Sequence, residues 1–174
     1  FNATRGAIRA LQHYGTPAQS ERIAERIEKA RTWLFENPAG DTEDRVSRLR
    51  ALYLLKEEME AKNEVTTLLS EQRKDGGWAQ LPKMKSDAYA TSTTMAALHQ
   101  TGGISTTNTA YQRGVQFLLS SQREDGSWFV ESRSKPFQSH YESGFPHGTN
   151  QFISISAASW ATTALALTLP KAMD

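Results

Sequence analysis

Three acids lie within four consecutive residues in the segment Asp41-Thr42-Glu43-Asp44. Adjacent carboxylates repel one another when all are charged, so such a cluster can keep one proton at neutral pH and donate it. The same residues suit the first turn of a helix, where acids complement the helix dipole and Asp41 or Thr42 can cap free N–H groups. The segment therefore has two interpretations, a proton donor and a helix start.

The segment 140–151 holds the densest group of polar and aromatic side chains in the chain. Its candidate ligand-binding residues are His140, Glu142, Phe145, His147 and Gln151. The two histidines and Glu142 could bind a metal, although their spacing matches no standard motif and we expect none. The alternatives are a ligand pocket using Glu142, His147 and Gln151, or a loop whose polar groups satisfy one another.

Asp87 and Tyr89 are two further candidates, at the start of the preceding apolar helix. Glu43 and Asp44 occupy the same place in the helix before that one. If the protein has a site, these helix starts and the loop 140–151 should converge on it. Helix N-termini would favour an anionic group there.

Helical spacing of apolar residues predicts the elements that position these side chains. The expected helices are 3–14, 17–37, 42–56, 64–72, 86–100, 109–121 and 152–169. The charged segment 57–63 is expected to be a connection. In helix 42–56 the residues expected to face inward are Val46, Leu49, Leu52 and Tyr53.

These helices alternate in composition. Those at 17–37, 64–72 and 109–121 carry charged, longer side chains, whereas those at 42–56, 86–100 and 152–169 are apolar with small residues. No segment shows sustained period-2 alternation. We therefore expect an all-α stack of helical hairpins with an inner and an outer layer.

A repeated motif supports this stack. Gln122 ends one helix, and a glycine turn leads from it to Trp128; a second copy runs from Gln72 to Trp78, 50 residues earlier. Repetition at this spacing is typical of stacked helical pairs. Each Gln can bond backbone groups at a neighbouring helix end while each Trp stacks over it, so we expect all four residues to be structural.

At these Gln-(x)3-Gly-x-Trp segments the sequence resembles the repeats of squalene-hopene cyclases, oxidosqualene cyclases and protein prenyltransferases. Residues 113–128 meet every position of the fuller repeat, 63–78 meet its second half and 29–34 its first half. The resemblance implies an α/α toroid. A closed toroid would have six helical pairs, and this chain has three and one extra helix.

The chain begins at Phe1 within a helical pattern, so we expect residues 1–174 to be one toroid domain that is a fragment of a longer chain. Alternatively, two copies pair or the arc stays open. An open arc would expose an apolar face of small residues, of the kind that marks a ligand or partner site.

The resemblance also bears on the acid cluster. Asp41-Thr42-Glu43-Asp44 is similar to the Asp-x-Asp-Asp motif of squalene-hopene cyclases, where a protonated aspartic acid donates a proton to an alkene, but Glu43 replaces the middle Asp. The resemblance implies that Asp41, Glu43 and Asp44 are the catalytic acids of an isoprenoid cyclase. A cyclase cavity should hold carbocations on aromatic faces, and aromatics are only 9% of this chain. That composition argues against polyene cyclisation.

Other activities of related toroids are less well supported. The prenyltransferase zinc site and the complement-type thioester both need cysteine, and the chain has none. The segment 75–80 resembles part of some toroid pectate lyases, which need calcium-binding acids and an arginine base. Arginines of the inner helices occur only in the first pair, as Arg45, Arg48 and Arg50.

Overall composition limits the partners. A net charge of +1 gives no electrostatic case for nucleic acid, and no apolar run reaches the roughly 18–20 residues that span a bilayer. We expect a soluble, non-catalytic ligand- or partner-binding module of a larger bacterial-type protein, without a cofactor. Its expected partners are an apolar or isoprenoid-like small molecule, a second copy, or the rest of the same chain. The alternatives are the isoprenoid cyclase and a carbohydrate-active toroid enzyme.

Overall fold

The structure is a computed structural model that describes residues 1–135 and 141–170. Seven α-helices lie in these ranges: α1 (Asn2–Tyr14), α2 (Ser20–Glu36), α3 (Thr42–Leu55), α4 (Glu58–Ser70), α5 (Ala88–Gln100), α6 (Thr109–Ser121) and α7 (Gln151–Ala166). Two short 3-10 helices, η1 (Pro17–Gln19) and η2 (Gly148–Asn150), precede α2 and α7. The described ranges contain one isolated β-bridge, between Trp78 and Asp87, and no strand. The predicted all-α class is confirmed.

The expected helices differ from the observed ones mainly at α4. The prediction that 57–63 is a connection is wrong, because α4 begins at Glu58 and runs through this segment. Its buried residues are Glu64 and Leu68, so a charged residue occupies a core position and hides the apolar spacing. Acids in the first turn, Glu58 and Glu60, favour this earlier start through the helix dipole.

One inward-facing prediction for α3 is also wrong. Val46, Leu49 and Leu52 are buried, whereas Tyr53 is 52% exposed. Tyr53 follows Leu49 by four residues and Val46 by seven, so helical spacing places it on the same side of the helix as these two. Its exposure means that the packed elements leave the last turn of α3 partly uncovered at this position.

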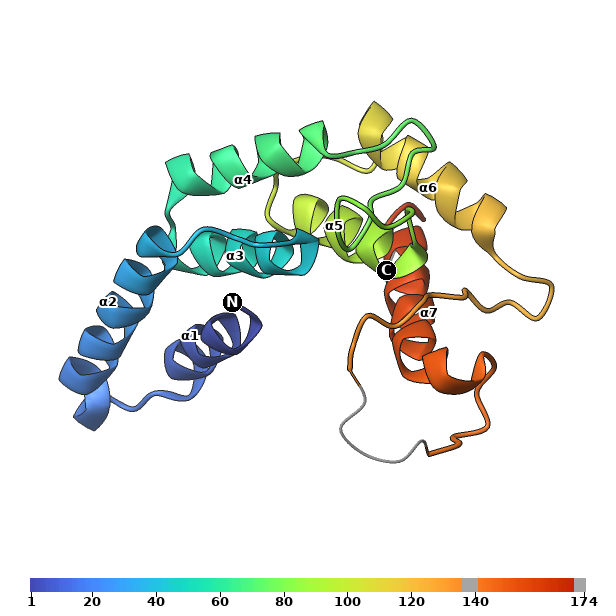
Figure 1. The fold of residues 1–174 in the computed structure, drawn as a ribbon. Coiled ribbons are helices and arrows are strands. Elements are labelled where there is room, and N and C mark those ends of the chain that lie inside the picture. The colour runs from blue at the N-terminus through green and yellow to red at the C-terminus, as the bar shows by residue number, and fades with distance from the viewer. Residues whose placement is uncertain (136–140, 171–174) are drawn as a thin grey trace. The chain divides into compact units, whose positions relative to one another are not determined.

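The helices form two compact units, Phe1–Ser70 and Glu71–Asp174. In the first unit α3 lies between α1 and α4, and α2 packs against α1 and α3 (Figure 1). Its buried cluster consists of Ile8, Leu34, Ala51 and Leu55. One residue comes from α1, one from α2 and two from α3, so this cluster joins three helices.

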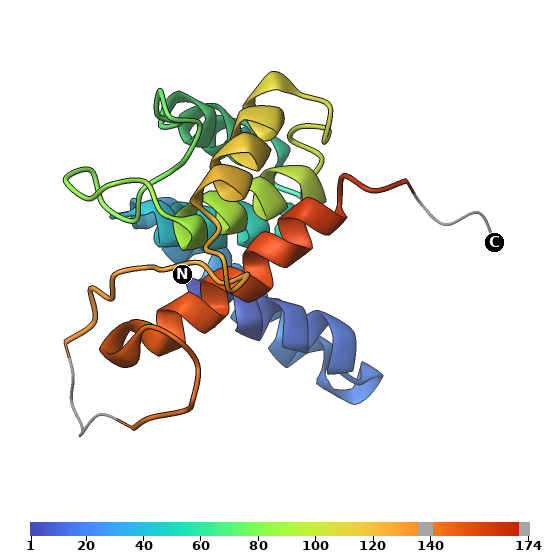
Figure 2. The same cartoon turned by 90° about the vertical axis from the view of Figure 1, so that its right-hand side faces the viewer.

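In the second unit α5 lies between α6 and α7 (Figures 1 and 2). The contact of α5 with α7 is built from small side chains, and Ala96, Ala97, Ala157 and Ala161 are fully buried. The Tyr111 hydroxyl of α6 donates a hydrogen bond of 2.7 Å to the carbonyl of Ala164 in α7. Small-residue helices thus form one layer and the longer-chained α6 lies outside it.

The two copies of the repeated turn share a hydrogen bond from Gln to the glycine four residues later. The side-chain amide of Gln72 donates to the Gly76 carbonyl over 2.8 Å, and that of Gln122 donates to the Gly126 carbonyl over 3.0 Å. Trp78 is 1% exposed and Trp128 is 3% exposed. The Trp128 indole donates to the Leu118 carbonyl of α6 over 2.8 Å. These contacts within the protein explain why Gln and Trp occupy these positions, and no ligand is needed to explain them.

The link to a neighbouring helix is seen at one copy. The Gln72 amide also donates to the Ala110 carbonyl in the first turn of α6, over 2.7 Å. The hydrogen bond found for Gln122 stays within its own turn. The expected link between hairpins is therefore made by Gln72.

Candidate functional site

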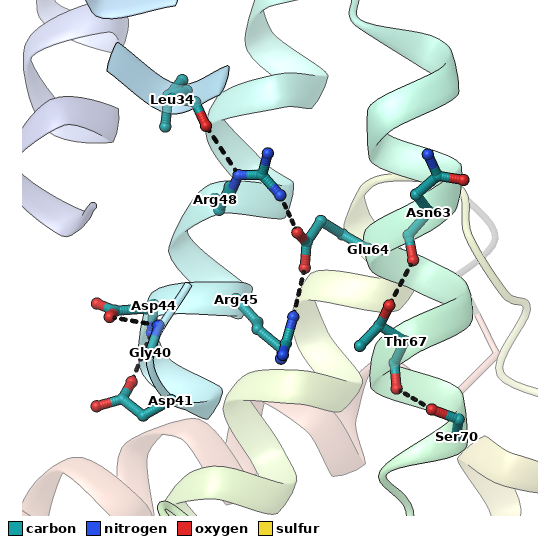
Figure 3. A network of polar contacts seen from close by, with 10 residues as sticks. All are labelled: Leu34, Gly40, Asp41, Asp44, Arg45, Arg48, Asn63, Glu64, Thr67 and Ser70. Atoms are coloured by element: carbon teal, nitrogen blue, oxygen red, sulfur yellow. Dashed lines mark hydrogen bonds and ion pairs between the residues drawn. The ribbon is translucent and has the colours of Figure 1, made fainter. Parts of the chain in front are cut away.

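The acid cluster lies at the start of α3. Asp41 is the N-cap, and its carboxylate accepts a hydrogen bond from the Asp44 amide over 2.8 Å (Figure 3). The Asp44 carboxylate accepts from the Gly40 amide over 3.1 Å. Glu43 lies 3.5 Å from the Ser47 hydroxyl one turn later. Asp41 therefore caps a first-turn N–H group of α3, and Asp44 binds the N–H group of the residue before the N-cap.

The same unit contains a second polar cluster, which the sequence did not predict. Glu64 of α4 is 4% exposed and lies between Arg45 and Arg48 of α3 (Figure 3). Its carboxylate accepts a short hydrogen bond from Arg48 and lies 3.6 Å from the Arg45 guanidinium. Arg48 also donates to the Leu34 carbonyl of α2 over 3.1 Å. The cluster thus joins α2, α3 and α4.

This ion-pair cluster removes an argument for lyase chemistry. Arg45 and Arg48 were two of the inner-helix arginines that a pectate lyase-like site would require. Both guanidinium groups face the buried Glu64 carboxylate. This ion pair joins two helices, so we assign both arginines a structural role.

The start of α5 is organised by Asp87. One carboxylate oxygen accepts from the Ala90 amide over 2.9 Å, and the other accepts from the Gln80 side chain over 3.1 Å. Burial raises the pKa of the Asp87 carboxyl above its ordinary value of 3.8, and the hydrogen bonds from Ala90 and Gln80 oppose this shift. Gln80, 5% exposed, was not predicted as a site residue. Its side chain also lies 3.4 Å from the Glu131 carbonyl.

The start of α7 is organised by Gln151, which is fully buried. Its side-chain oxygen accepts from the Ser143 amide over 2.7 Å and from the Ser143 hydroxyl. Its side-chain nitrogen donates to the Tyr141 carbonyl over 2.7 Å. Glu142 accepts from the Gly144 amide over 2.9 Å. These contacts match a loop that satisfies its own polar groups.

His147 lies next to the second repeat turn. Its Nε2 lies 2.8 Å from the Ser127 hydroxyl, which donates to the Asp125 carboxylate over 2.6 Å. The hydrogen bonds from Ser127 hold the pKa of Asp125 below its ordinary value. In a Ser-His-Asp triad the carboxylate binds the histidine. Here the carboxylate binds the serine, so the order of contacts differs from that of a triad.

Aromatic rings surround this histidine. The Phe129 ring lies 5.5 Å from the His147 ring and the Phe145 ring lies 6.3 Å from it, both edge to face. The Arg123 guanidinium lies over the Phe129 ring at 5.2 Å. Residues from the repeat turn and from the loop before α7 are thereby brought into one cluster.

Two of the predicted helix starts are linked within the second unit. Gln80, which bonds Asp87, reaches the Glu131 carbonyl, and the next residue, Ser132, donates to Asn150 at the start of α7 over 2.8 Å. The segment 130–132 thus runs between the starts of α5 and α7. The start of α3 lies in the other unit, and its convergence with them stays a prediction.

The metal alternative rests on a residue outside the described part of the chain. His140 belongs to 136–140, so its place beside Glu142 and His147 stays untested. Among the residues that the structure describes, no three His, Asp or Glu side chains are grouped so that they could hold a metal ion. Within the same residues, no helix has the length and apolar character to cross a bilayer.

Asp87 gives a testable pH dependence. Its raised pKa means that the folded chain binds a proton more readily than the unfolded chain just above pH 3.8, so the free energy of unfolding increases as the pH falls through this window. Asp87→Asn removes this titration and keeps a capping side chain. Urea unfolding at pH 4 and pH 7 should therefore show the wild type gaining stability, relative to Asp87→Asn, at the lower pH.

Asp87→Ala provides the matched comparison. It removes the cap and leaves the Ala90 amide without its partner, and it should cost about 1–2 kcal/mol at pH 7. If the two variants lost equal stability at pH 7, the cap would not be the main contribution of this side chain.

Comparison with known families adds one finding. A family model of the squalene-hopene cyclase C-terminal domain matches residues 37–166, about three quarters of the 174 residues. The match begins just before Asp41 and ends at the last residue of α7. The α/α-toroid architecture of that domain agrees with the alternation of small-residue and longer-chained helices. A search of curated proteins found no match.

Proposed function

Because the chain belongs to the squalene-hopene cyclase C-terminal domain family, we propose that it is a non-catalytic, ligand-binding module of this α/α-toroid type. The proposal rests mainly on the hydrogen bonds that the acid cluster makes at the start of α3. Asp41 and Asp44 both accept hydrogen bonds from backbone amides. These bonds turn a carboxyl oxygen of each aspartate toward the backbone at the helix start, whereas protonation of an alkene needs an acid directed at the substrate.

The candidate ligand surface surrounds the start of α7. Three aromatic side chains there are solvent-exposed: Phe129 at 42%, Tyr141 at 71% and Phe152 at 54%. The hydrogen bonds of Gln151 to the backbone at Tyr141 and Ser143 hold the loop that carries one of them. Aromatic rings on a fixed backbone offer large contact areas at low entropic cost. This supports an apolar or isoprenoid-like small molecule as the ligand.

The alternative is an isoprenoid cyclase that uses the acid cluster at 41–44. Incubation with squalene in detergent, followed by gas chromatography and mass spectrometry, separates the two functions. We expect no cyclised product from the wild type. A cyclised triterpene whose formation is lost in the triple variant Asp41→Asn, Glu43→Gln, Asp44→Asn would contradict the proposal.

Binding is tested in the same preparation by squalene that co-elutes with the protein in gel filtration. We expect co-elution to fall at least fivefold in the triple variant Phe129→Ala, Tyr141→Ala, Phe152→Ala, because about 2 kcal/mol of apolar contact can be lost per ring. The variant Asp41→Asn, Glu43→Gln, Asp44→Asn should bind squalene like the wild type. Absence of squalene from the wild-type peak would contradict an apolar ligand.

A further inference from the structure

We propose that the groove between α1 and the start of α2 binds a small amphiphilic carboxylate, one with a short alkyl chain or a single ring. This site lies in the first unit and is independent of the ligand surface proposed for α7. The groove has a volume of about 290 Å³. That is the lower end of the range for small-molecule sites, so one short chain or ring is the occupant that it fits.

The floor of the groove is apolar. Leu11 and Tyr14 of α1 and Ile23 of α2 line it, and so does the small side chain of Ala10. Gly15, at the end of α1, also lines it; a Cβ atom there would lie 2.3 Å from the Ile23 side chain. The absence of a side chain at Gly15 therefore lets Ile23 approach the turn. Tyr14 is 79% exposed, and its ring packs edge to face against His13 at 4.6 Å.

The rim of the groove is cationic. Among the described residues that line it, the charged ones are Arg22 and Arg26, one turn apart on α2. Glu25 pairs with Lys29 over 2.7 Å and also attracts Arg26, and Glu21 directly precedes Arg22. Helix α1 contains Arg5 and Arg9 and no acid. Two guanidinium groups beside an apolar floor complement a carboxylate attached to an apolar group, since arginine binds carboxylates through paired N–H donors.

The test is isothermal titration calorimetry of the 174-residue chain with sodium octanoate below its micelle concentration. We expect saturable binding of octanoate and none of octyltrimethylammonium, which has the same chain and the opposite charge. The double variant Arg22→Ala, Arg26→Ala should weaken octanoate binding at least tenfold, because it removes both charge-assisted contacts. Ala10→Phe should weaken it similarly by filling the groove without changing any charge.

A matched control removes two exposed cations that do not line the groove. Arg9→Ala, Lys62→Ala changes the net charge equally and should bind octanoate like the wild type. The proposal is overturned if octyltrimethylammonium binds as well as octanoate, or if the two double variants weaken binding equally. It is also overturned if the wild type does not bind octanoate but sediments with phosphatidylglycerol vesicles, or forms dimers that Ala10→Phe dissociates.

Discussion

Gly76→Ala is expected to destabilise the protein by about 3 kcal/mol, as the sum of a strained backbone and a steric clash. Gly76 has a φ of +87°, in the left-handed region that side chains disfavour. A Cβ atom at this position would lie 2.4 Å from the Arg113 carbonyl oxygen and 2.9 Å from its carbon. Both atoms belong to the backbone of α6, so neither can move without shifting the helix.

The clash would also affect the repeat turn. The Gly76 carbonyl accepts from Gln72, and the same Gln72 amide reaches the Ala110 carbonyl of α6. Arg113 donates a short hydrogen bond back to the Arg73 carbonyl of the turn. Displacing the turn from α6 would weaken this set of contacts together. Urea denaturation followed by circular dichroism measures the loss.

The second copy of the turn supplies the control. Gly126 occupies the same position, with a φ of +80°, but a Cβ atom there would have no neighbour within 4 Å. Gly126→Ala should therefore cost only the backbone strain, about 1 kcal/mol. Equal losses in the two variants would show that the approach of Gly76 to α6 is unimportant for stability.

Glu64→Ala is expected to destabilise the protein by about 3 kcal/mol, since it removes the buried carboxylate that pairs with the Arg48 guanidinium and lies beside that of Arg45. The Arg48 and Arg45 side chains are only 16% and 26% exposed. Arg48 is further held by its bond to the Leu34 carbonyl, so it cannot turn to solvent without losing that contact. Thermal unfolding should show a correspondingly lower midpoint.

Two comparisons test the reason for this loss. Glu25→Ala removes a surface pair with Lys29 and should leave the unfolding midpoint unchanged, because solvent and salt screen exposed pairs. Glu64→Leu combined with Arg48→Met replaces the buried pair by apolar groups and should recover much of the lost stability. If Glu64→Ala were as mild as Glu25→Ala, the cluster between α3 and α4 would contribute little.

Short-range patterns predicted most of the helices. Helix α6 was predicted at its observed bounds, because Asn108 caps its start and Gln122 begins the glycine turn after it. Helix α4 was predicted six residues too late because Glu64 occupies its buried face. Apolar spacing indicates a helix only where core positions hold apolar residues.

The candidate site was predicted less well. The sequence identified the helix starts, and Asp41 and Asp87 are indeed N-caps. It did not indicate that Gln80 would bond Asp87 or that His147 would meet Ser127, 20 residues away in sequence. Each of these contacts depends on how a loop folds back over a helix.

The sequence by itself determined the all-α class, the alternation of small-residue and charged helices, and the two repeat turns, since these depend on neighbours within one or two helical turns. Only the tertiary structure decided the burial of Glu64 between two arginines, the chain of contacts from Asp87 to the start of α7, and the groove beside Arg22 and Arg26. These features join residues that are distant in sequence. Their energies come from desolvation and close packing, which exist only after the helices have assembled.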